Sequence, residues 1–128
     1  VDASTFVSHY LSRAHRDGRA SGCTMAALGA DAARQPGPVR EAFAAGIENL
    51  VAALTQPGAG LTALDADHAR ARTLDMLAHA VGALVMSRAC PDDSPLADEL
   101  LAVSRKALLE SLRPPPAART PLRRRGAG

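Results

Sequence analysis

The fold is decided by residues 38–55, PVREAFAAGIENLVAALT. Their larger apolar side chains recur every three or four residues, which is the period of an amphipathic α-helix. Those side chains belong to Val39, Phe43, Ile47, Leu50 and Leu54. Pro38 suits the first turn of a helix, where its missing N–H has no intrahelical partner to lose. Pro57 to Gly60 would end the helix, so the segment predicts one helix that packs by a single face.

Four more segments with helical periodicity flank this helix. They cover residues 4–17, 23–34, 65–90 and 95–112, and glycine and proline breaks separate them. Alanine and leucine, which favour helices, are abundant, whereas Phe6, Tyr10 and Phe43 are the only aromatic residues. We therefore expect an all-α fold with five helices in one domain over residues 1–112. A disordered tail rich in proline and arginine is expected over residues 113–128.

The helices expected over 65–90 and 95–112 carry more apolar surface than one packing face needs. From Leu74 onward little of the circumference of the first of them is polar, and the second has a broad arc of leucines. Excess apolar surface of this kind predicts cover on more than one side. We expect a homodimer through these two helices, with an interface that includes Val81, Leu84, Val85, Arg88, Leu101 and Leu108.

The net charge of +2 is unevenly distributed along the chain. Residues 1–112 carry ten basic and thirteen acidic side chains, a balance of −3, whereas residues 113–128 carry five arginines and no acid. A mildly acidic domain offers no basic face to a phosphate backbone, so we do not expect it to bind DNA by itself. The longest apolar run, Met76–Met86, is too short to span a bilayer. We expect a cytoplasmic protein with no membrane partner.

Histidines are the first candidates for metal binding. His9 and His15 are six residues apart, which would place them on different faces of one helix, and His68 and His79 are separated by about three turns. Neither pair would converge on one ion. Asp75 and His79 lie four residues apart, on one helix face within hydrogen-bonding reach. This pair would contact a ligand or sense pH if it lined a cavity, and would be an ordinary surface pair if exposed; the spacing leaves both interpretations open.

The two cysteines and the serines show no catalytic arrangement. Cys23 follows a glycine near a helix start, where a thiol can become reactive, although a small buried apolar residue is the commoner role. Cys90 is far away in the sequence, and without a C-x-x-C spacing the two give neither a disulfide framework nor a zinc site. No base with an orienting residue marks a serine nucleophile. The sequence therefore predicts no catalytic residue, no metal and no cofactor.

Several short stretches occur along the chain in an order that characterises one family. They are Tyr10–Asp17, Gly22–Cys23, Ala26–Ala30, Pro38–Phe43, Gly46–Glu48, Val81–Val85, Ser87–Ala89 and Asp98–Leu101. In this order they resemble the regulatory domain of a subgroup of TetR-like (tetracycline-repressor-like) transcriptional regulators. The similarity runs over roughly residues 5–110 and so covers nearly all of the predicted helical part.

The resemblance implies a ligand-responsive bacterial repressor, represented here by its effector-binding and dimerisation domain. A helix-turn-helix domain, absent from this chain, would lie upstream and supply the contact with DNA. The last two helices would pair with those of a second copy as a four-helix bundle. A small apolar or amphipathic effector would lie among the earlier helices, facing Phe6, Tyr10, Met25, Phe43, Ile47, Met76 and His79.

A function of a different class is also compatible with these residues. A stand-alone helical module without a ligand pocket would use the same apolar helices for assembly alone. A cavity among the earlier helices would favour effector binding, with Tyr10 or His79 as its polar group. Dry, close packing in the same place would favour the assembly module.

Overall fold

The computed structural model describes residues 2–18, 24–56 and 66–113. Within these ranges every regular element is an α-helix, which confirms the prediction of an all-α fold. The helices are α1 (Ala3–Tyr10), α2 (Arg13–Asp17), α3 (Thr24–Ala32), α4 (Gly37–Leu54), α5 (Ala66–Ala89) and α6 (Pro95–Ser111). Cys23 and residues 114–128 of the expected tail lie outside the described residues.

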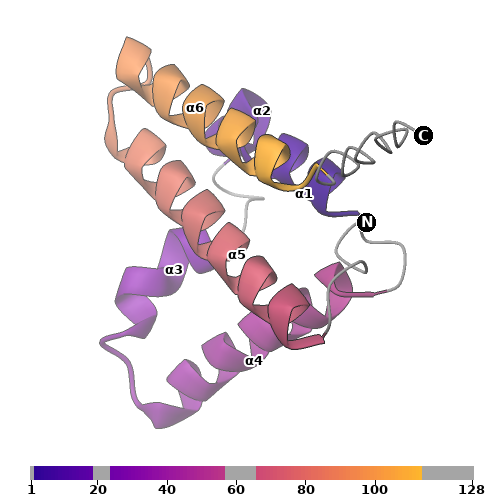
Figure 1. Ribbon diagram of the computed structural model, residues 1–128. Helices are drawn as coiled ribbons and strands as arrows, with labels where there is room; N and C mark the ends of the chain where they lie inside the picture. Colours follow the sequence, from indigo (N-terminus) through magenta and orange to yellow (C-terminus); the bar gives the residue numbers. More distant parts are fainter. Residues whose placement is uncertain (1, 19–23, 57–65, 114–128) are drawn as a thin grey trace, which may run out of the picture.

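Helix α5 is the central element, because every other described helix contacts it. α6 turns back from the C-terminal end of α5 and packs along it, with α1 and α2 next to this pair (Figure 1). α3 and α4 contact each other and pack against another part of α5. The contacts of α5 are therefore divided between two groups of helices, and the candidate site lies on the α3–α4 side.

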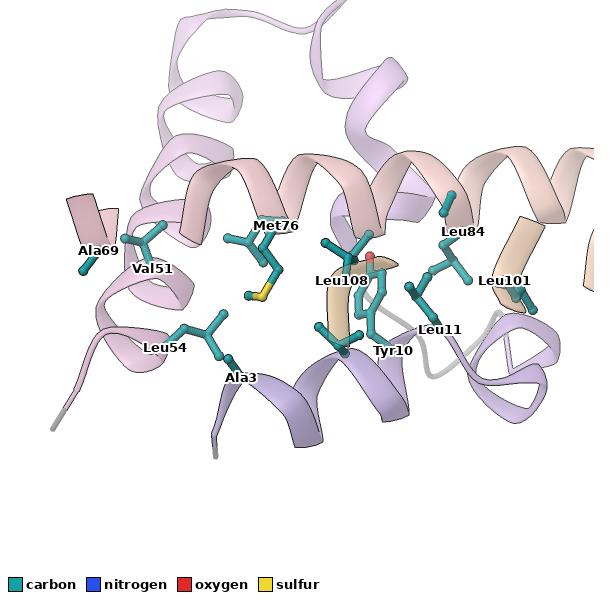
Figure 2. Packing of buried hydrophobic residues seen from close by; sticks show 14 residues of the cluster. Ala3, Tyr10, Leu11, Val51, Leu54, Ala69, Met76, Leu84, Leu101 and Leu108 are labelled. Carbon is teal, nitrogen blue, oxygen red and sulfur yellow. The ribbon is translucent and has the colours of Figure 1, made fainter. Parts of the chain in front are cut away.

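The apolar core lies mainly between α1, α5 and α6, and the C-terminal end of α4 closes it (Figure 2). Leu11, Leu54 and Leu84 are at most 1 % exposed. Burying a leucine stabilises the fold by roughly 1.5–3 kcal/mol relative to leaving it in water, so this cluster is the main source of stability. The buried members are Ala3, Val7, Tyr10, Leu11, Val51, Leu54, Ala69, Met76, Leu77, Ala80, Ala83, Leu84, Leu101 and Leu108.

The prediction of a single helix over residues 4–17 is wrong, because the chain leaves the helical path around Ser12. Ser12 has an extended backbone, and its hydroxyl oxygen accepts a hydrogen bond from the amide of His15 at 3.1 Å. The same hydroxyl donates to the carbonyl of His9 at 2.7 Å. A serine bonded in this way to the local backbone competes with a continuous helix. The break reorients α2, so that Arg16, which a continuous helix would expose, is fully buried.

The other helix boundaries follow the breaks expected from the sequence. The helices predicted over 23–34, 38–55, 65–90 and 95–112 correspond to α3, α4, α5 and α6, with ends that agree within two residues. Proline occupies the first turn of both α4 and α6, a position that suits it because the N–H it lacks would have no partner within the helix. Among the described residues, no helix combines the length and the apolar character that crossing a bilayer requires.

Candidate ligand site

A hollow of about 330 Å³ lies between α3, α4 and α5 and is partly open to solvent. We call it the main hollow. Its volume is near the lower end of the roughly 300–1,000 Å³ that is usual for small-molecule sites. It is lined by Met25, Gly29, Phe43, Ile47, Leu74, Leu77, Ala78 and Val81.

Small residues beside large ones create this space. Gly29 of α3 faces Phe43 of α4, and a Cβ atom added to Gly29 would lie 3.6 Å from the Phe43 Cζ, an ordinary contact distance. Ala78 of α5 lies one turn from Leu74 and Val81 on the same side of the helix. The longer side chains hold the helices apart, and the short ones do not fill the gap. Leu74, which lines the hollow, is 38 % exposed.

The structure brings together three of the residues that the sequence assigns to the ligand site. Met25 of α3 and Phe43 and Ile47 of α4 all line the main hollow. The amphipathic face of residues 38–55 therefore has a double role. Its N-terminal part borders the hollow, and its C-terminal part, with Leu54, enters the core.

The other four residues that the sequence assigns to the ligand site do not line the main hollow. Tyr10 and Met76 are each 3 % exposed inside the core, and Phe6 stacks on Tyr10 with ring centroids 5.2 Å apart. They pack there because α1 lies against α6 and α5. His79 is exposed, as is Asp75, so the pair lies on the surface of α5. Neither of the two polar groups expected in the pocket lines the main hollow.

Sequence reasoning misses the contribution of α5 to the hollow. The residues concerned are Leu74, Leu77, Ala78 and Val81, and on α3 Gly29 is missed as well. The apolar stripe that starts at Leu74 is the signal in the sequence. Periodicity shows that a stripe is apolar, but it does not distinguish a stripe facing a ligand from one facing a second copy.

The residues expected at a dimer interface differ in how far one chain already buries them. Leu84, Leu101 and Leu108 are at most 4 % exposed within one chain, because α1, α5 and α6 already cover them. Val81 is half-buried and borders the main hollow. Val85 is exposed, at 43 %. The large apolar residues that α5 and α6 leave exposed beyond the main hollow are Val85, Met86, Leu96 and Val103.

A buried arginine joins α2 to the C-terminal end of α5. The Nε of Arg16 donates to the hydroxyl oxygen of Ser87 at 2.8 Å, and its Nη2 donates to the carbonyls of Ser87 and Cys90 at 2.8 and 3.1 Å. Its Nη1 donates to the carboxylates of Asp17 and Asp92 at 2.8 and 2.9 Å. A buried guanidinium is tolerated because each of its nitrogens has an acceptor.

Two further arginines extend this cluster. Arg13 donates from Nε to the carboxylate of Asp17 at 2.9 Å. Hydrogen bonds from Arg13 and then from Arg16 hold the pKa of the Asp17 carboxyl below its ordinary value. Arg88, an expected interface residue, instead donates to the backbone carbonyls of His15 and Arg16, both at 3.0 Å. Arg16 therefore bonds from α2 to α5, and Arg88 bonds from α5 back to α2.

The break at Ser12 also brings His9 and His15 together, contrary to the expectation from their spacing. Their ring centroids lie 5.4 Å apart, and the His15 Nδ1 lies 2.8 Å from the carbonyl oxygen of Tyr10. In the part of the chain that the structure describes, no group of three or more potential metal-ligating side chains gathers. Two imidazoles fall short of the three or four protein ligands of ordinary zinc sites.

A second hollow, of about 280 Å³, lies between α3 and α4, and we call it the side hollow. It shares Gly29, Phe43 and Ile47 with the main hollow, so the two spaces are neighbours beside the contact between α3 and α4. Its other lining residues are Ala32, Ala33, Arg40 and Ala44. Arg40 is thus the one charged group that borders either of these two hollows.

Comparisons with models of protein families, with curated proteins and with solved structures find no match. The chemistry of the main hollow is therefore the basis on which a function can be proposed. None of its eight lining residues has a titratable or nucleophilic side chain. The space can hold an apolar molecule but presents no group that would react with it.

Proposed function

We propose that this chain is the ligand-binding and dimerisation domain of a TetR-like transcriptional repressor. A small molecule in the main hollow would alter the DNA binding of a helix-turn-helix domain elsewhere in the full-length protein. The observation that carries the proposal is the partly open apolar hollow between α3, α4 and α5. Moving an apolar ligand from water into such a space is favourable because both apolar surfaces leave water.

The exposed apolar residues of α5 and α6 support the dimerisation part of the proposal. Met86 is 57 % exposed, and Leu96 and Val103, one heptad apart on α6, are 52 % and 62 % exposed. α5 and α6 already pack together, so a second copy of this pair would complete a four-helix arrangement. About half of each such side chain is already buried, so burying the rest contributes about 1 kcal/mol per residue, and several residues on each copy are needed to hold a dimer.

Helix α5 offers a physical link between a ligand and the N-terminal helices. Leu77 and Val81 border the main hollow, while Ser87 and Arg88, further along the same helix, bond to α2. A shift of α5 upon ligand binding would therefore disturb its contacts with α2. In the proposed repressor this is the route by which occupancy of the hollow changes DNA binding.

The test is ligand-dependent thermal unfolding of the chain with a panel of apolar small molecules. A ligand at one hundred times its dissociation constant stabilises the folded state by about 2.7 kcal/mol. Ile47→Trp should fill the hollow and abolish this shift. Ala45→Trp is the matched control, because Ala45 is exposed on the same helix and does not line the hollow. A panel without any stabilising ligand, or an equal response of Ile47→Trp and Ala45→Trp, would contradict the proposal.

The alternative is a helical assembly module without a ligand. The exposed apolar residues on α5 and α6 favour assembly under either function. Self-association of a chain that no apolar molecule stabilises would select the assembly module. A helix-turn-helix encoded upstream of Val1 would instead favour the repressor.

A further inference from the structure

We propose that the ligand is an amphipathic anion, with an apolar chain in the main hollow and a carboxylate bound by Arg40 at the side hollow. This inference rests on the proposed function, because it names the ligand class for the same site. The apolar lining of the main hollow cannot accept the head of such a molecule, since an unpaired charge is costly to bury. We place the head at Arg40, because it is the one charged residue that borders either hollow.

The geometry of α4 allows one molecule to reach both places. Arg40 and Phe43 lie one turn apart, and Ile47 follows one turn later, so all three share one side of the helix. The distance along the axis from Arg40 to Ile47 is roughly 10 Å at 1.5 Å per residue. Phe43 and Ile47 border both hollows, so a ligand chain lying along these two side chains would span the distance from one space to the other.

The positive charge of Arg40 is available to a ligand. Arg40 is exposed, and no acidic side chain among the described residues forms an ion pair with it. Two arginines of α5, Arg70 and Arg72, already have other hydrogen-bond partners. Arg70 donates to both carboxylate oxygens of Glu48 at 2.8 and 2.7 Å, and Arg72 donates to the carbonyl of Ser111.

The position of Arg40 near the N-terminus of α4 also favours an anion at this place. The first turn of α4 contains no acidic residue, and Pro36 provides no side-chain cap. The positive end of the helix dipole therefore disfavours an arginine and favours an anion at the same place. Glu41 follows directly, but adjacent helical residues point in different directions, and Glu41 lines neither hollow.

Isothermal titration calorimetry with octanoate, octanol and octylamine tests the inference, because the three molecules share a chain and differ in the charge of the head. The wild-type chain should bind octanoate two- to five-fold more tightly than octanol, as expected for an exposed ion pair, and octylamine most weakly. Arg40→Gln should make the affinities for octanoate and octanol equal, whereas Arg40→Lys should keep most of the preference for octanoate. Arg105→Gln is the control, because Arg105 is an exposed arginine on α6 that lines neither hollow.

The possible failures are distinguishable. Equal affinity of the wild-type chain for octanoate and octanol would overturn the inference and leave the proposed apolar binding intact. A preference for octanoate that survives Arg40→Gln would overturn the assignment of the head to Arg40. Binding of none of the three molecules would overturn the inference, whereas the proposed function fails only if no apolar molecule of the panel stabilises the chain. Circular dichroism at 222 nm shows whether Arg40→Gln is folded.

Discussion

Replacing Arg16 by methionine should destabilise the chain far more than the same change at Arg13. The two arginines stand on α2, three residues apart, and both bond to the carboxylate of Asp17. They differ in burial, since the side chain of Arg16 is 0 % exposed and that of Arg13 is 38 % exposed. Methionine retains much of the apolar stem in each case and removes the guanidinium.

The expected loss in the free energy of unfolding follows from the hydrogen-bond acceptors that lose their donor when Arg16 is replaced. The side chains of Asp17 and Asp92 are 49 % and 72 % exposed, so water can replace the guanidinium at these carboxylates at little cost. The three bonds to Ser87 and Cys90 are less accessible to water. Each contributes roughly 0.5–1.5 kcal/mol, and together they indicate a loss of about 3 kcal/mol. This is a substantial fraction of the roughly 5–15 kcal/mol by which small domains are stable.

The assay is equilibrium unfolding in urea, followed by circular dichroism at 222 nm. Arg16→Met should lower the free energy of unfolding by about 3 kcal/mol, and Arg13→Met by at most about 1 kcal/mol because its ion pairs are exposed. Similar losses for the two variants would refute the reasoning, since burial would then not distinguish the two arginines. A loss for Arg16→Met below about 1 kcal/mol would show that the cluster contributes little to stability.

Two further predictions concern assembly and pH. Val103→Glu should convert the proposed dimer into a monomer with unchanged helicity, because Val103 is 62 % exposed in one chain and an unpaired charge is costly to bury between two. Sedimentation measures this, and a wild-type monomer at micromolar concentration would refute the dimer. The lowered pKa of Asp17 means that its carboxylate stabilises the fold fully above about pH 4 and loses this effect as the pH falls through the folded value. The urea midpoint of the wild-type chain should therefore fall below pH 4 more steeply than that of Asp17→Asn, and parallel profiles would contradict the assigned contacts.

The residues of α4 show how much of the fold could be predicted from the sequence. Their apolar period and the prolines beside them depend on neighbours within a few positions, so the helix and its ends were predictable. The same holds for α3, α5 and α6. The break at Ser12 is local too, but a serine that caps a new helix inside a continuous apolar pattern does not disturb the periodicity.

The candidate site could be predicted only in part. Met25, Phe43 and Ile47 line the main hollow as expected, because they are the larger residues on the faces that α3 and α4 turn toward α5. Tyr10 was expected beside them, yet α1 packs against α6 and buries it in the core. The placement of Tyr10 depends on which helices pack against α1. The periodicity of a single segment does not show which helix that is.

The helical class, most helix ends and the apolar faces follow from the amino-acid sequence, because they depend on local backbone preference and on side chains a turn apart. What covers each apolar face depends on how the helices pack against one another. Leu84, Leu101 and Leu108 are core because α6 returns along α5, while Leu74 borders the main hollow because Gly29 and Ala78 leave space unfilled. The buried Arg16 has hydrogen-bond partners because the C-terminal end of α5 and the turn after it bring acceptors from seventy-one or more residues away in the sequence. Contacts between distant segments are set by how whole helices pack, and periodicity along one segment does not record them.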